Sequence, residues 1–195
     1  MELAYLENIS KEFNYYKSLG EKTLDQLSET EINFIPNPEG NSIATIVKHL
    51  SGNMLSRWTN LFHEDGEKSW RNRDQEFINK KTSKNSVLDD WNAGWDCFFH
   101  TFNQLSETDL HTTIYIRNQG YTVLEALNRQ LAHYTYHVGQ LVFIGKFIKN
   151  TDWKSLSIPK GKPTDFNALK FSNKKRKHIL RKTFNIPFRF CKFAL

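Results

Sequence analysis

Four segments of the chain carry apolar residues at alternating steps of three and four, the spacing that keeps one face of an α-helix apolar. Turn-forming residues separate these segments. Four such helices bury their apolar faces most simply by packing against one another. The pattern therefore predicts an all-α fold, an antiparallel four-helix bundle. The clearest segment spans residues 86–105, with apolar positions at Leu88, Trp91, Trp95, Phe98, Phe102 and Leu105.

The other three predicted helices have recognisable starts or breaks. The first spans about residues 3–27, and Gly20 near its middle weakens the expectation of an unbroken helix. The second follows the segment IPNPEGNS, where Asn41 or Ser42 is the expected N-cap. The fourth begins near Thr122, because Glu125 follows three residues later, as in a capping box. The expected inward residues of these helices are Leu6, Ile9, Phe13, Tyr16, Leu24 and Leu27; Ile43, Val47, Leu50, Met54, Trp58 and Leu61; and Leu124, Leu127, Leu131, Tyr134, Val138, Leu141, Gly145 and Ile148.

A long polar segment, residues 63–86, separates the second and third predicted helices. It is too long for a simple turn and too rich in charge for a core, and long ordered loops often carry function. Before the fourth helix, the residues TTIYI at 112–116 are compatible with a short extended segment.

The positive charge of the chain is concentrated at its end. The net charge is +6, but residues 172–195 hold eight Lys or Arg and no acid, which leaves 19 basic and 21 acidic residues before them. We therefore expect one helical domain over residues 1–171 and a basic, flexible extension over residues 172–195. The charge gives no reason to expect that the main domain binds nucleic acid.

Several classes of protein lack support in the sequence. No stretch reaches the roughly 18–20 apolar residues of a transmembrane helix, and the start shows no signal peptide, so the expected location is the cytoplasm. Cys97 and Cys191 form no CxxC pair, so a metal would need nitrogen or oxygen ligands. The absence of a glycine-rich phosphate loop and of GxSxG argues against nucleotide-binding proteins and serine hydrolases.

Three histidines are placed to share a metal ion. His133 and His137 are four residues apart on the fourth predicted helix, so their rings project from one face about one turn apart. His49 flanks the apolar face of the second helix and can present a third nitrogen. Neutral imidazole suits zinc, nickel, copper or ferrous iron, and three protein ligands leave a coordination position open. The alternative is ordinary hydrogen-bonded histidines near the core. The histidines that lack a partner at ligand spacing are His63, His100 and His111.

Neighbouring polar residues are candidates for supporting roles. Asn53 follows His49 by about one turn and is placed to orient a bound water or ligand, and Gln140 is placed to hold an imidazole N–H of His137. Packing is the alternative for both, and it is the expected role of Tyr134, which flanks the pair together with Tyr136. A set of charged residues either covers the open metal position and binds an anionic substrate group or forms a salt-bridged, exposed loop: Arg57, Asp65, Glu67, Lys68, Arg71, Arg73, Asp74 and Glu76.

The order of these features resembles the DinB/YfiT-like superfamily of proposed metalloenzymes, four-helix bundles with a histidine on the second helix and HxxxH on the fourth. The strings SGNMLSRWTNLF, DGEKSWRNRDQEF, HYTYHVGQLVFIGK and WKSLSIPKGKPTDFN are similar to an uncharacterised bacterial subgroup of it. The resemblance implies that His49, His133 and His137 bind one divalent transition metal, with zinc or nickel as the expected ion. It is also compatible with a homodimer.

The resemblance leaves the reaction open, since the superfamily includes thiol S-transferases that use low-molecular-weight thiols and members with no known reaction. The leading hypothesis is Lewis-acid chemistry at an open three-histidine site, either thiol transfer or metal-assisted hydrolysis, on a small molecule. The nucleophile would be an activated water or thiol, because no protein side chain is placed for that task. A second hypothesis is a non-catalytic bundle that binds a metal or small ligand. A third is a protein that binds nucleic acid or a membrane through its basic tail.

Overall fold

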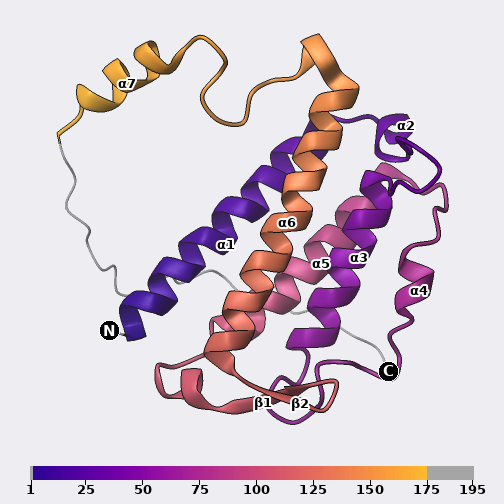
Figure 1. Ribbon diagram of the computed structural model, residues 1–195, viewed down its shortest axis with the longest axis vertical. Helices are drawn as coiled ribbons and strands as arrows, with labels where there is room; N and C mark the ends of the chain where they lie inside the picture. The colour runs from indigo at the N-terminus through magenta and orange to yellow at the C-terminus, as the bar shows by residue number, and fades with distance from the viewer. Residues whose placement is uncertain (1, 175–195) are drawn as a thin grey trace. The chain divides into compact units, whose positions relative to one another are not determined.

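The computed structural model describes residues 2–174 and is mostly helical (Figure 1). Its four long helices are α1 (Glu2–Asp25), α3 (Ile43–Trp58), α5 (Lys84–Phe102) and α6 (Val123–Lys149). They are connected by the short helices α2 (Glu29–Ile32) and α4 (Arg73–Glu76), the 3-10 turn η1 (Thr108–His111) and an antiparallel hairpin of β1 (Thr113–Ile116) and β2 (Gln119–Thr122). The 3-10 turn η2 (Asn150–Asp152) follows α6. The prediction of a largely helical protein is confirmed, with one small hairpin added.

The chain forms two compact units, which divide after Pro159. The first holds all elements from α1 to η2. The second begins at Lys160 and contains α7 (Pro163–Phe171), whose proline at the helix start suits the free N–H positions there. The predicted basic extension, residues 172–195, lies outside the described residues from residue 175 onward. No helix within residues 2–174 is long and apolar enough to cross a membrane.

The long helices of the first unit run as two parallel pairs. Near the starts of α1 and α6, the Tyr5 hydroxyl donates to Asn128 Oδ1 at 2.9 Å, and near their ends Gly145 of α6 lies against Thr23 of α1. Near the ends of α3 and α5, the Thr101 hydroxyl donates to the Trp58 carbonyl at 2.8 Å. Figure 1 shows α3 and α5 running in the direction opposite to α1 and α6.

The predicted antiparallel alternation is therefore wrong for α3 and α5, which follow one another along the chain and point the same way. The reason is the connection between them, residues 59–83 with α4 inside it. A helix of 19 residues such as α5 is about 28 Å long, and this connection is long enough to return the chain over that distance before α5 begins.

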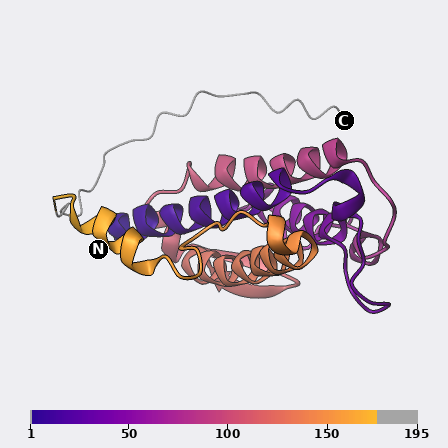
Figure 2. The same ribbon diagram turned by 90° about the horizontal axis from the view of Figure 1, so that it is seen from above.

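The core lies between the four long helices, and every apolar position predicted to face inward is buried or half-buried. Seen from above, α5 and α6 lie on opposite sides of the first unit (Figure 2). An aromatic cluster fills the space between them: the rings of Phe13 and Phe98 are 4.4 Å apart, and Trp58 Nε1 donates to the Tyr134 hydroxyl at 2.9 Å. This packing fixes the spacing of α3 and α6, the two helices that carry the predicted histidines.

The N-caps predicted for the second and fourth helices are present in the structure. Ser42 is the N-cap of α3, and Thr122 caps α6 in a capping box with Glu125, as predicted. Helix α1 continues unbroken through Gly20. The Trp91 ring of α5 packs where a side chain at this position would lie. The extended segment before α6 is β1, and β2 is its unpredicted partner.

A close approach of α3 and α5 at Gly94 yields a stability prediction. A Cβ at this position would lie 2.9 Å from Ser51 Cα, a backbone atom that cannot move alone. We expect Gly94→Ala to lower the free energy of unfolding by about 1–3 kcal/mol, measured by urea denaturation.

Gly139→Ala on α6 is the matched control, because a Cβ there meets no atom within 4 Å. It should raise the free energy of unfolding by up to about 1 kcal/mol through helix propensity. Equal effects of the two substitutions would contradict the close approach.

Candidate metal centre

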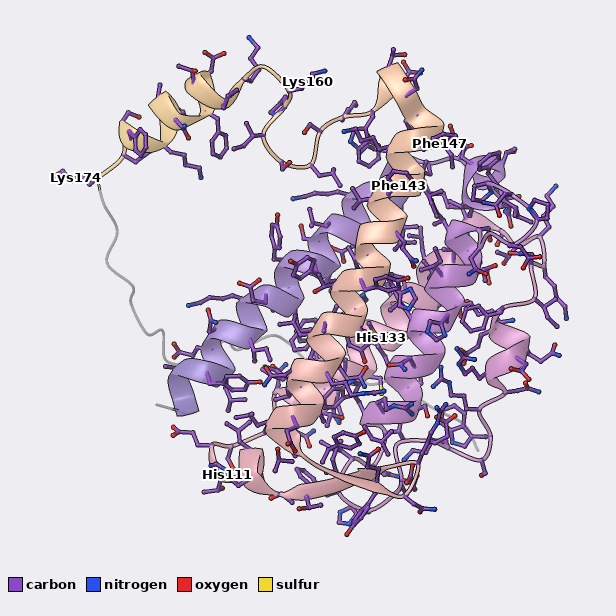
Figure 3. The ribbon with its side chains drawn as sticks, viewed as in Figure 1. His111, His133, Phe143, Phe147, Lys160 and Lys174 are labelled. Atoms are coloured by element: carbon purple, nitrogen blue, oxygen red, sulfur yellow. The ribbon has the colours of Figure 1, made fainter. Side chains whose placement is uncertain are left out.

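Three imidazole nitrogens from two helices converge at one point. His133 Nε2 on α6 lies 3.4 Å from His49 Nε2 on α3 and 3.1 Å from His137 Nε2. The ligand atoms of all three residues lie within 4.8 Å of one another. Two imidazole nitrogens bound to one tetrahedral zinc at about 2.0–2.1 Å would be about 3.3–3.4 Å apart. We call these three residues the histidine centre; Figure 3 shows His133 on the side of α6 that faces α3.

The outer nitrogens of two of these rings are held by oxygen atoms. His49 Nδ1 lies 2.9 Å from Glu76 Oε2, and His137 Nδ1 lies 2.8 Å from Gln140 Oε1. Because these oxygens accept, both Nδ1 atoms carry the hydrogen and both Nε2 atoms turn lone pairs toward the centre. This is the tautomer that a metal ligand needs.

The third ring, His133, cannot by itself donate hydrogen bonds to the lone pairs of both His49 and His137. Its neutral form carries one hydrogen, and a hydrogen on Nε2 serves only one neighbour well. Its Nδ1 is buried and has no hydrogen-bond partner among the described residues, whichever nitrogen carries the hydrogen. The donor set therefore fits a divalent metal ion better than a network of hydrogen bonds alone.

The protonation of the centre favours metal binding at neutral pH. Burial lowers the pKa of His133 to about 3, with the charges that His137 and His49 would carry adding to the effect. Burial also lowers the pKa of His137. Both rings are therefore neutral at pH 7, and their lone pairs are available.

Arg71 holds both carboxylate oxygens of Glu76, the residue that contacts His49. Arg71 donates from Nε to Oε1 at 2.7 Å and from its terminal nitrogen to Oε2 at 2.9 Å, which is a bidentate pair. Burial raises the pKa of the Glu76 carboxyl, but the hydrogen bonds from His49 and Arg71 outweigh it, and the net pKa is lowered. Gly52 on α3 leaves the space that this carboxylate occupies, because a Cβ there would collide with Oε1.

A polar cavity of about 400 Å³ opens beside the histidine centre. Asn53 lies in its wall, and its Oδ1 is buried without a hydrogen-bond partner among residues 2–174. Apart from the histidines, Asn53 and one phenylalanine, the described lining consists of five arginines. The lining residues are His49, Asn53, Arg57, Arg71, Arg73, Phe77, Arg117, Arg129, His133 and His137.

The structure brings together the three predicted histidines and both predicted supporting residues. Asn53 lines the cavity and Gln140 contacts His137, as expected. Tyr134 is buried in the core, which confirms its packing role, and Tyr136 is exposed. The three histidines with no other histidine at ligand spacing in the sequence lie outside this group: His63, His100 and His111.

The charged set divides into several roles. Arg57 lies in α3 and not in the loop, and it lines the cavity with Arg71 and Arg73. Asp65 accepts from the backbone N–H groups of Arg117 and Asn118, each at 2.8 Å, and so ties the loop to the hairpin turn. The interpretation as an exposed salt-bridged loop is wrong for the members whose side chains are buried: Arg57, Lys68, Arg71 and Glu76. Glu67 pairs with Arg57, and Asp74 is exposed beside the cavity wall.

Sequence reasoning missed two features of the site. It did not assign Glu76 to His49, since the two residues are 27 positions apart and no spacing rule links them. It also missed three residues of the cavity wall, Phe77, Arg117 and Arg129, of which Arg129 precedes His133 by four residues and therefore lies one turn away on the same helix face.

Comparison with known families matches residues 1–162 to the family described as "Protein of unknown function (DUF1572)". The chain belongs to this family. The match covers every residue of the histidine centre and of the cavity lining. No curated protein matches the chain.

The support around Glu76 yields a prediction about metal affinity. Glu76→Gln removes the charge that faces His49, and Gly52→Ala places a methyl group where the carboxylate lies. We expect each substitution to lower the affinity for zinc by about 10–100-fold, measured by competition with a zinc chelator.

Glu64→Gln is the matched control for the loop, because Glu64 is exposed and pairs with Lys68 away from the histidines. Unchanged zinc affinity in Glu76→Gln, in a protein with wild-type circular dichroism, would contradict the role given to Glu76.

Proposed function

We propose that this protein binds one divalent transition metal ion through His49, His133 and His137 and uses it for Lewis-acid chemistry on a small molecule. The observation that carries the proposal is the convergence of one ring nitrogen from each histidine within 4.8 Å of one another, with two outer nitrogens held by oxygen acceptors. Zinc and nickel are the expected ions, because imidazole nitrogen suits both.

The fold proposal behind this function is a four-helix bundle of the DinB/YfiT-like type over residues 1–171. Its support is the position of the histidines: His49 is on the second long helix, and His133 and His137 form HxxxH on the fourth. A cytoplasmic location and a homodimer remain proposals from the sequence, as does the separate basic extension at residues 172–195.

Access to the centre favours a catalytic site over a purely structural one. Structural zinc sites are closed by four protein ligands, whereas catalytic sites have three and an open position. Here residues 2–174 supply one group of three convergent histidines, and a cavity lies beside it. A stable metal protein without any reaction is the alternative outcome.

Each residue of the site then has a defined task. The three histidines hold the ion, Glu76 and Gln140 orient two of the rings, and Arg71 keeps the Glu76 carboxylate in place. A bound divalent ion supplies a Lewis acid that activates a water or a thiol.

The nucleophile would come from outside the protein. The described cavity lining contains no hydroxyl, thiol, amine or carboxylate side chain. This composition supports thiol transfer or metal-assisted hydrolysis, as the resemblance implies, and gives no support to a covalent enzyme intermediate.

The test is the metal content of protein purified without chelator and without a metal-binding tag. We expect wild type to hold about one equivalent of a transition metal and His137→Ala to lose it, because two imidazoles bind far more weakly than three. His100→Ala is the matched control, since His100 is exposed and bonds to Gln104 away from the centre.

Equal metal content in His137→Ala and wild type would refute the proposed ligand set. If wild type holds metal that His137→Ala loses, the metal-loaded protein should catalyse thiol transfer or hydrolysis that disappears on metal removal. Absence of both activities would favour the non-catalytic alternative.

A further inference from the structure

The cavity beside the histidine centre has a large excess of positive charge. Five guanidinium groups line it, from α3, the loop with α4, the hairpin turn and α6. Two carboxylates contact them: Glu67 pairs with Arg57 and Arg117, each at 3.1 Å, and Glu76 pairs with Arg71. Five positive charges therefore face two negative ones, and a bound metal ion would add to the difference.

Two of these arginines have no acidic partner among the described residues. The Arg73 guanidinium lies 5.0 Å from the centre of the Phe77 ring, and Arg129 lies 6.0 Å from the centre of the Tyr121 ring. Contacts with aromatic faces hold a guanidinium in place without using its N–H donors on a carboxylate. Both side chains are exposed, so a ligand can reach their donors.

The two unpaired arginines stand on different elements beside one opening. Arg73 begins α4, and Arg129 lies one helical turn before His133 on α6. Guanidinium groups form paired hydrogen bonds with phosphate and carboxylate oxygens, and such charge-assisted bonds are about twice as strong as neutral ones. An uncharged or cationic ligand would leave the excess charge unbalanced.

We propose that this cavity binds small molecules through a dianionic oxyanion group, a phosphate monoester or a pair of carboxylates, held by Arg73 and Arg129. This substrate class deepens the proposed function, because the two arginines line the same cavity as the three histidines. The anion binding itself does not depend on the metal, and the two proposals can therefore fail separately.

The experiment is isothermal titration of wild-type protein stripped of metal and then dialysed free of chelator, at low ionic strength and pH 8, because a polycarboxylate chelator would compete for the site. The probes are methyl phosphate, a dianion at this pH, and dimethyl phosphate, which carries one negative charge. Succinate is the dicarboxylate probe. We expect methyl phosphate or succinate to bind at least about 10-fold more tightly than dimethyl phosphate, since a second charge gains a second charge-assisted contact. The tighter of the two dianions identifies the source of the group.

Arg73→Gln and Arg129→Gln should each weaken the binding of that dianion by about 10-fold or more. Lys146→Gln is the matched control, because Lys146 is an exposed cation on α6 outside the cavity and its loss changes the net charge equally. All three variants should keep the wild-type unfolding midpoint, since the three side chains are exposed.

Three results would overturn the proposal: no binding of either dianion, equal binding of dimethyl phosphate, or an equal loss in Lys146→Gln and the two arginine variants. Dianion binding by metal-free protein would stand even if the protein never holds a metal. Metal content that depends on His137, together with absent dianion binding, would refute the substrate class and leave the proposed metal site intact.

Discussion

Three imidazoles whose lone pairs point at one another repel unless a cation lies between them, and the arrangement around the histidine centre follows from this constraint. A metal ligand needs its other ring nitrogen to carry the hydrogen, and an oxygen acceptor behind the ring fixes that tautomer and the orientation of the ring. Glu76 and Gln140 provide those acceptors for His49 and His137. Gln140 lies on the same helix as His137, so helix formation alone brings the two side chains together. Glu76 is 27 residues from His49, so the chain fold has to bring them together.

The connection between α3 and α5 brings Glu76 to the centre. Because α3 and α5 are parallel, the chain must return past α3 before α5 begins, and α4 lies on this return path (Figure 1). The return places Glu76 against His49 and Gly52, and it places Arg71 and Arg73 in the wall of the cavity. A short turn between the two helices would give an antiparallel pair and would leave His49 without its acceptor. The same connection therefore returns the chain along α3 and supplies residues that support the site.

The sequence predicts the features that depend on local spacing. The apolar faces of the helices, the caps at Ser42 and Thr122, the pairing of His133 with His137 and the contact of Gln140 with His137 all follow from spacings of three and four. The grouping of His49 with this pair is implied by the family resemblance. The direction of α5 and the pairing of Glu76 with His49 do not, because each depends on where a 25-residue connection runs in space. Three arginines of the cavity, Arg57, Arg71 and Arg73, belong to the charged set named from the sequence, whereas Arg117 and Arg129 escape prediction because they come from the hairpin turn and α6.

The central claim is that one ion is held by three imidazoles, and zinc-edge X-ray absorption of the zinc-loaded protein tests it most directly. The account predicts three imidazole nitrogens at about 2.0–2.1 Å, with a further light atom from outside the protein completing the coordination. A spectrum with fewer than three imidazoles, or with a sulfur ligand at about 2.3 Å, would contradict the assignment of His49, His133 and His137.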